Sequence, residues 1–140
     1  MAYWLVKSEP ETFSWDDQVK AGKKGTDWTG VRSHPAKLNL QKMVKGDKAF
    51  FYHSGGEKQI VGIVEIAKPA YPDRTAEPDE PWVVVDTVAA EPLKTPVTLS
   101  TIKADAKLKE MALVKLSRLS VQPVTDAEWK HICKLGGVKG

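Results

Sequence analysis

Short apolar runs rich in β-branched and aromatic residues recur along the chain, and each is bounded by Gly, Pro, Ser or Asp. Such runs between turn signals are typical of strands. They predict strands at residues 3–7, 48–53, 59–67, 82–89 and 118–124. The second and third strands are separated by Ser54-Gly55-Gly56-Glu57-Lys58, which predicts a hairpin.

Polar caps and helical spacing predict short helices between and after the strands. Ser14 with Asp17, and Thr125 with Glu128, have the spacing of helix starts, and Gly136 is placed to end the last helix. The predicted helices cover residues 14–22, 36–43, 100–104, 107–115 and 125–135. Residues 69–81 contain four prolines, which predicts a loop long enough to carry a function.

With a further short extended piece at residues 97–99, strands outnumber helices in this pattern, and 140 residues suit one hydrophobic core. We therefore predict a single domain over residues 1–140 with an α+β fold, in which a small, strongly curved or closed mixed sheet is flanked by short helices. The hydrophobic content of 41% and the five tryptophans argue against disorder. Four of them, Trp4, Trp15, Trp82 and Trp129, lie in periodic segments and are predicted to pack in the core.

Charge and cysteine content narrow the possible partners. The net charge of +3 permits an anionic partner without requiring one. The lone Cys133 excludes an internal disulfide and a cysteine-based zinc site, and its apolar helix predicts an unreactive, structural thiol. No secretory signal precedes the first strand, and no window approaches the roughly 20 apolar residues of a membrane span. We therefore expect a cytoplasmic protein with no membrane partner.

The sequence contains no enzyme motif. It has no phosphate-binding glycine loop, no HExxH, no paired metal-ligand spacing and no nucleophile elbow, and its three histidines are scattered. This predicts a protein without catalytic residues, metal or cofactor. Two other functions stay open: an enzyme or sensor that binds a free nucleotide or small molecule, with His53 or Glu9 as acid or base, and a protein-interaction domain that uses the loop at residues 69–81.

Trp28 lies between Asp27 and Thr29, in a segment without periodicity. It has two interpretations: an anchor that holds an irregular segment to the core, or a wall on which a planar base stacks, worth roughly 1–3 kcal/mol per base. If it is a stacking wall, Trp28→Ala would abolish base recognition and leave most of the fold intact. Cations follow Trp28 at the start of a predicted helix, where phosphate groups bind readily. The predicted phosphate-binding residues are Arg32, Lys37, Lys42 and Arg118.

The run Phe50-Phe51-Tyr52-His53-Ser54 brings a phenol, an imidazole and a hydroxyl to a glycine turn, as at the edge of a pocket. Tyr52 and Ser54 fit pocket lining and ordinary strand hydrogen bonding equally well. In the last predicted strand, Arg118 and Ser120 alternate with apolar residues, so their side chains are expected to face solvent or a cleft.

Six segments taken in order resemble the EVE domain family and together span nearly the whole chain. They read YWLVKSEP at residues 3–10, WTGVR at 28–32, FYHS at 51–54, YPD at 71–73, PVTL at 96–99 and RLSVQPV at 118–124. Ser33, Lys37 and Gln41 stand where family members usually have Asn, Arg and Arg.

The resemblance implies a PUA-like fold, a strongly bent β-barrel with helices around it, similar to YTH and ASCH domains. It also implies a non-catalytic reader of nucleic acid, which flips a modified base, a modified cytosine in DNA or a base in RNA, into an aromatic pocket. By position, the residues implied around that pocket are Lys7, Ser8, Glu9, Trp28, Val31, Arg32, Ser33, Tyr52, His53, Ser54, Arg118, Leu119 and Ser120.

Overall fold

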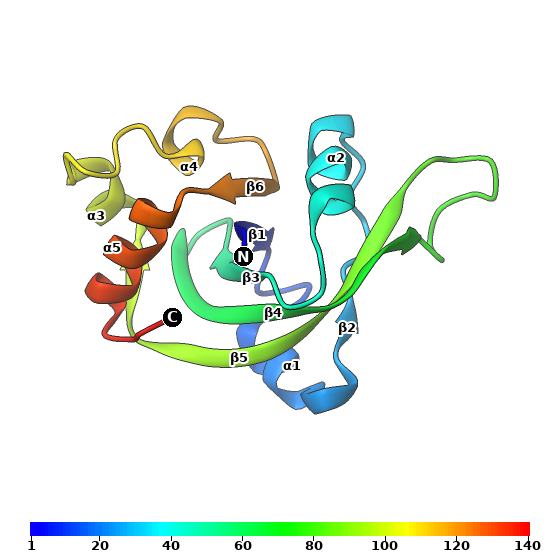
Figure 1. Cartoon of the computed structure of the whole chain (residues 1–140), viewed down its shortest axis with the longest axis horizontal. Coiled ribbons are helices and arrows are strands. Elements are labelled where there is room, and N and C mark those ends of the chain that lie inside the picture. The colour runs from blue at the N-terminus through cyan, green and yellow to red at the C-terminus, as the bar shows by residue number, and fades with distance from the viewer.

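A strongly curved six-stranded sheet forms the centre of the molecule in the computed structural model, which describes residues 1–140 (Figure 1). The strands are β1 (Tyr3–Ser8), β2 (Thr26–Asp27), β3 (Lys48–His53), β4 (Gln59–Pro72), β5 (Val83–Thr98) and β6 (Val121–Val124), in the order β2-β5-β4-β3-β1-β6. β1 runs parallel to β3, and all other neighbours are antiparallel. The predicted α+β fold with a curved mixed sheet is confirmed. The sheet curls without closing, because its edge strands β2 and β6 do not pair.

Strands β4 and β5 run well past their predicted ends. β4 continues through Pro69 to Pro72, and β5 continues through Pro92 and Pro96, so the prediction of a loop was wrong for residues 69–72. Proline lacks only the donor N–H, and a strand tolerates it where that donor would not be used. The β4–β5 register shifts at four places, and such irregularities bend the strands.

The helices are short and surround the sheet. They are α1 (Trp15–Lys20), the 3-10 turn η1 (Gly22–Lys24), α2 (His34–Lys42), α3 (Leu99–Ala104), α4 (Ala112–Lys115) and α5 (Asp126–Gly136). Figure 1 shows α3, α4 and α5 around one end of the sheet, while the β4–β5 hairpin projects from the other end beside α2. The predicted N-cap at Ser14 and the predicted capping box at Thr125 are present, and Ser14 forms a capping box too. The prediction of Gly136 as the cap of α5 was wrong by one residue, because Gly136 is still helical and the left-handed cap is Gly137. No helix is both long and apolar enough to cross a membrane.

Two predicted elements are shorter than their patterns suggest. The helix predicted over residues 107–115 is reduced to α4, and residues 106–110 form turns. The strand predicted over residues 118–124 begins only at Val121. The buried amide of Gln122 donates to the carbonyls of Leu116 (3.1 Å) and Leu119 (2.8 Å), and these bonds hold the preceding segment in a turn. Arg118, Leu119 and Ser120 therefore lie in this turn.

The two faces of the sheet carry two hydrophobic clusters. Because side chains alternate along β3, Phe50 and Tyr52 belong to one cluster and Phe51 to the other. The first cluster includes Trp129 of α5, which stacks on Phe50 at 4.0 Å between ring centroids. The second includes residues of α1 and α2. Trp82 is the exception to the predicted core: it is partly exposed and lies 5.0 Å from the ring of His34.

Cys133 is expected to resist alkylation in the folded protein. It is 2% exposed, and burial, with a smaller contribution from Glu91, raises the pKa of the Cys133 thiol to about 11. The reactive thiolate should therefore be scarce at neutral pH. We expect labelling by iodoacetamide to be roughly 100-fold or more slower than in the denatured protein, followed by mass spectrometry. Labelling at the rate of a free thiol would contradict the assignment.

Candidate nucleic-acid interface

A cavity of about 660 Å³ opens where the end of β1 meets β2. This volume lies within the range of small-molecule sites. The cavity is lined by Lys7, Ser8, Glu9, Thr12, Phe13, Thr26, Asp27, Trp28, Thr29, Gly30 and Arg74. The structure thus brings together four of the predicted pocket residues, namely Lys7, Ser8, Glu9 and Trp28.

Trp28 both lines this cavity and belongs to the core. It is 7% exposed, and its ring meets Phe51 edge to face at 5.4 Å and Phe13 at 6.1 Å. Its backbone N–H donates to the carbonyl of Val85 (2.9 Å), next to β2. The core interpretation is therefore confirmed, because the indole anchors an irregular segment, and the stacking interpretation stays a prediction for a ring that also lines the cavity. Because the ring is a core residue, we now expect its removal to destabilise the fold as well, and not to leave it intact.

A tight turn after β1 forms the facing wall. The Ser8 hydroxyl donates to the carbonyl of Phe13 (2.6 Å), and the Glu9 carbonyl accepts from the N–H groups of Thr12 and Phe13 (2.9 Å each). The Ser8 carbonyl in turn accepts from the N–H of Ser54, which ties the β3–β4 turn to this wall. Ser8 therefore shapes the cavity, while the exposed Glu9 side chain lies at its rim.

Arg74 and Asp27 both line the cavity and form an ion pair with each other. Neither was predicted as a site residue. The Nε of Arg74 donates to one carboxylate oxygen of Asp27 (2.7 Å), and its Nη2 donates to the other (3.3 Å). The ion pair with Asp27 raises the pKa of Arg74. A signal was present in the sequence, because Arg74 directly follows the family-like segment YPD.

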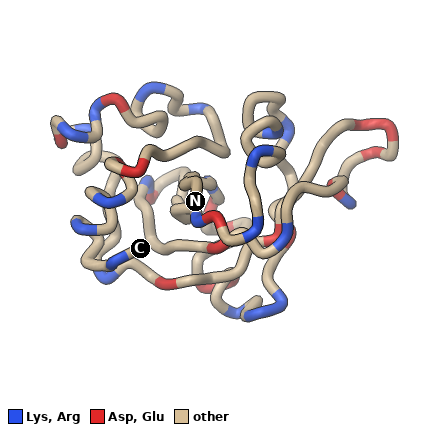
Figure 2. The backbone as a smooth tube through the Cα atoms, in the orientation of Figure 1, with Lys and Arg blue, Asp and Glu red and all other residues tan.

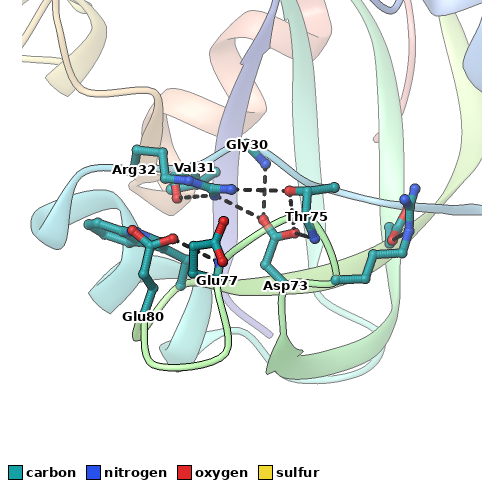
Figure 3. Close-up of polar contacts among 10 residues, drawn as sticks. Gly30, Val31, Arg32, Asp73, Thr75, Glu77 and Glu80 are labelled. Carbon is teal, nitrogen blue, oxygen red and sulfur yellow. Dashed lines mark hydrogen bonds and ion pairs between the residues drawn. The ribbon is translucent and has the colours of Figure 1, made fainter.

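The Arg32 side chain forms hydrogen bonds with the β4–β5 loop (Figure 3). Its Nη1 donates to Asp73 (3.0 Å) and to the carbonyl of Val31 (3.1 Å), and its Nη2 donates to the hydroxyl of Thr75 (3.1 Å). The guanidinium also lies 5.9 Å from the ring of Trp82. Arg32 therefore ties the segment after Trp28 to the hairpin, instead of projecting freely toward a phosphate group.

Asp73 is the buried centre of this network. Burial alone would raise its pKa, but hydrogen bonds from the side chain and N–H of Thr75, from Arg32 and from the N–H of Gly30 outweigh burial and lower the pKa of Asp73 to about 2. Asp73 thus stays ionised and fixes the backbone at Gly30, which lines the cavity. The network is a support for the site, not part of its surface.

Tyr52 lies on the other face of the sheet, away from Trp28. Its ring is buried in the cluster that includes Phe50, and burial raises the pKa of its phenol. The Nζ of Lys7 lies 5.9 Å from the Tyr52 ring and donates to the carbonyl of Ser117 (2.6 Å). Burial lowers the pKa of Lys7. Lys7 therefore connects the cavity to the turn at residues 117–120.

Both ring nitrogens of His53 have structural partners. Its Nε2 accepts from the backbone N–H of Trp15 (3.0 Å), so the ring proton lies on Nδ1, which donates to Glu57 (2.9 Å). This hydrogen bond lowers the pKa of Glu57. His53 is 8% exposed and does not line the cavity, so the structure gives it a positioning role between α1 and the β3–β4 turn.

A second groove of about 550 Å³ lies at the start of α2 and contains other predicted residues. Its lining is Ser33, Pro35, Lys115, Leu116, Ser117, Arg118 and Leu119. The Ser33 hydroxyl caps α2 by accepting from the N–H of Ala36 (3.3 Å). The bond from Lys7 to Ser117 links this groove to the cavity. Val31 is buried in the cluster of Trp28, and the Ser120 carbonyl accepts from the N–H of Lys7.

Charge is distributed unevenly over the molecule. Figure 2 shows acidic residues at the tip of the β4–β5 hairpin and basic residues along α2 and near α4. Of the predicted phosphate-binding residues, Lys37, Lys42 and Arg118 form no ion pair, whereas Arg32 is paired with Asp73. A polyanion would therefore meet least repulsion on the side of α2 and the α4–β6 turn.

The curled mixed sheet with peripheral helices places the protein among PUA-like folds. The YTH domain of the MRB1 protein of Zygosaccharomyces rouxii has this fold, with a TM-score of 0.58 at 16% identity over 96% of this chain and 86% of that one. Residues 2–135 match the model of the EVE domain. The chain belongs to the EVE domain family.

Its relatives include proteins of animals and bacteria. Mouse thymocyte nuclear protein 1 is 35% identical, over 95% of this chain and 73% of the relative. A crystal structure from Agrobacterium tumefaciens has a TM-score of 0.97 at 46% identity, over 100% of this chain and 96% of that one. The human thymocyte nuclear protein 1 structure, in complex with DNA containing 5-methylcytosine, has a TM-score of 0.90 at 32% identity and covers both chains fully.

Proposed function

We propose that this protein is a non-catalytic reader of nucleic acid, which binds a modified cytosine, extruded from DNA, in the cavity walled by Trp28. The observation that carries this proposal is the fit of the whole chain to the human relative that was crystallised with 5-methylcytosine DNA. The cavity supports it, because its lining combines the aromatic residues Trp28 and Phe13 with polar groups.

The energetics of base extrusion suit this cavity. Unstacking and unpairing a base costs a few kcal/mol. Stacking on an aromatic ring returns about 1–3 kcal/mol. The rest of the free energy needed for extrusion has to come from polar contacts at the rim of the cavity and from phosphate contacts outside the cavity. A methyl group on the base adds about 1–3 kcal/mol when it fits an apolar surface, which is enough to favour the modified base.

The strand on either side of the extruded base would follow the basic side of the molecule. Arg118 lines the groove at the start of α2, and Lys37 and Lys42 lie on that helix. Lys7 bonds to Ser117 and so joins this groove to the cavity. We propose that these cations contact the phosphates, while Arg32 keeps its structural partners.

The enzyme alternative is less well supported. Acid or base catalysis by His53 needs a free ring nitrogen beside the cavity, and both nitrogens have partners elsewhere. The Glu9 side chain has no hydrogen bond to another titratable group, so nothing positions it as an acid or base. The predicted cytoplasmic location stays a prediction.

The test is titration of the protein with oligonucleotides that differ in a single base. Cytosine, 5-methylcytosine and 5-hydroxymethylcytosine should be compared in single-stranded DNA, double-stranded DNA and RNA. We expect tighter binding to at least one modified cytosine, and Lys130→Ala on the exposed face of α5 should leave it unchanged. Equal affinity across the panel would contradict the proposal.

Binding is also expected to depend only modestly on salt. Each phosphate contact of a single strand contributes roughly −0.7 to the slope of log affinity against log salt. With Arg32 engaged by Asp73, two or three cations remain, so we expect a slope of about −1.4 to −2. Arg118→Ala should make the slope less steep by about 0.7. A slope near zero would indicate a free base or another small molecule as the ligand.

A further inference from the structure

We propose that Asp27 makes the cavity selective for bases that carry an exocyclic amino group, and that Arg74 holds the carboxylate in place for this purpose. The inference rests on the proposed function and names the chemistry that its site selects. Asp27 and Arg74 both line the cavity, together with Trp28, Glu9 and Lys7.

Asp27 is the more rigidly held of the two carboxylates at the cavity. Its backbone belongs to β2, which pairs with β5 through Asp86, and its side chain is 22% exposed. Arg74 donates a hydrogen bond to each carboxylate oxygen, at 2.7 and 3.3 Å. Glu9, in contrast, is exposed and has no side-chain partner among the hydrogen bonds. A carboxylate fixed in this way is ready to bind without reorganising.

Hydrogen-bond accounting shows what such a carboxylate selects. An ionised carboxylate only accepts hydrogen bonds, and its two oxygens offer about four lone-pair sites. Arg74 uses one site on each oxygen, so each oxygen retains one. A ligand must therefore present an N–H or O–H group to Asp27. A carbonyl oxygen there would face negative charge.

Nucleobases differ in whether they present a hydrogen-bond donor or an acceptor at this position. Cytosine and its 5-substituted derivatives carry an amino group that donates to Asp or Glu side chains. Thymine and uracil carry a carbonyl oxygen at that position, and their ring N–H lies between two carbonyl oxygens. Asp27 therefore favours a modified cytosine over thymine, although 5-methylcytosine and thymine share the same methyl group.

Arg74 has a positioning role in this scheme. Its side chain is 72% exposed, and its guanidinium has N–H groups beyond the two that bind Asp27. Removing the guanidinium keeps the charge of the carboxylate but no longer fixes its orientation, so the preference between bases should be reduced and not abolished. Removing the charge of Asp27 should abolish that preference. The two substitutions break the same ion pair and so separate selectivity from stability.

The experiment compares 5-methylcytosine with thymine at one position of a single-stranded oligonucleotide, where neither base is paired. We expect the wild-type protein to prefer 5-methylcytosine by roughly five- to 150-fold. Asp27→Asn should reduce this preference to within about threefold, because an amide can turn its NH₂ toward the thymine carbonyl. Arg74→Gln should give a preference between those of the wild type and Asp27→Asn, and melting temperatures of both variants should be recorded.

The outcomes separate this inference from the proposed function. If the wild-type protein distinguishes 5-methylcytosine from cytosine but not from thymine, the role of Asp27 is overturned and the reader function stands. Full preference in a folded Asp27→Asn variant would overturn it as well. If the protein distinguishes no modified base from cytosine, the proposed function itself fails, while a preference of the wild type for cytosines over thymine that is lost in Asp27→Asn would still support the role of Asp27.

Discussion

Trp28→Ala is expected to lower the free energy of unfolding by about 3–5 kcal/mol and to abolish binding of a modified base. The indole is 7% exposed and meets both Phe51 and Phe13 edge to face, so its removal leaves a void beside β3. Aromatic pairs of this kind add about 0.5–1.5 kcal/mol each beyond the buried area. The same ring closes the cavity, so stability and binding should fall together.

Chemical unfolding and oligonucleotide titration measure the two losses separately. Trp28→Phe is the matched control, because it keeps an aromatic ring while removing part of the volume. We expect it to recover part of the stability and part of the affinity. A Trp28→Ala protein that unfolds at the wild-type denaturant concentration would contradict the core assignment. One that is stable enough to fold at low temperature, yet binds the panel unchanged, would contradict the pocket.

Asp73→Asn is expected to destabilise the protein by about 1–3 kcal/mol at neutral pH. The buried carboxylate accepts from Arg32, Gly30 and Thr75, and the amide cannot accept all of these bonds. The Arg32 side chain is 37% exposed, so water replaces part of the hydrogen bonding that Arg32 loses. This limits the loss of stability. Because Gly30 lines the cavity, affinity for the base should fall as well.

The effect of Asp73→Asn should disappear in acid. The pKa of Asp73 is about 2 in the folded protein, below its ordinary value of 3.8, so the ionised form stabilises the fold above pH 4. This contribution is lost as pH falls from about 4 to about 2. Urea unfolding of both proteins across this range should show their stabilities converging.

Other carboxylates titrate in the same range and affect both proteins alike, so the difference between the two isolates Asp73. Asp79→Asn is the matched control, since Asp79 lies exposed on the same loop without a side-chain partner. It should behave like the wild type at every pH. A constant difference between wild type and Asp73→Asn down to pH 2 would show that the lowered pKa of Asp73 does not contribute to stability.

Local patterns in the sequence determined much of the fold. The strand at residues 48–53 matches β3, and the capping boxes at Ser14 and Thr125 start α1 and α5 as predicted. These features depend on neighbours within four residues, which a single sequence displays directly. The six family-like segments also sufficed to identify the EVE domain, as the match over residues 2–135 confirms.

Proline and glutamine show where local patterns misled. Pro69 and Pro72 suggested a loop, yet β4 passes through both, because β5 supplies a partner at Tyr71 and Pro72. The polar and apolar alternation before Val121 suggested a strand, yet the buried amide of Gln122 binds the carbonyls of that segment. The β4–β5 pairing is a tertiary contact, whereas the Gln122 bonds span only six and three residues, and it is the burial of this polar side chain that the sequence pattern does not display.

From the sequence by itself, the family resemblance predicted that Trp28 and several polar groups surround one pocket, and Trp28, Lys7, Ser8 and Glu9 do line one cavity. Only the tertiary structure decided which polar groups do so. Arg32 meets Asp73 from 41 residues away, and Arg74 meets Asp27 from 47 residues away. Alternation along β3 places Phe51 and Tyr52 on opposite faces, but the face that holds the cavity depends on how β1, β2 and β5 pair. Such contacts join distant segments, and their partners become fixed only when the sheet curls.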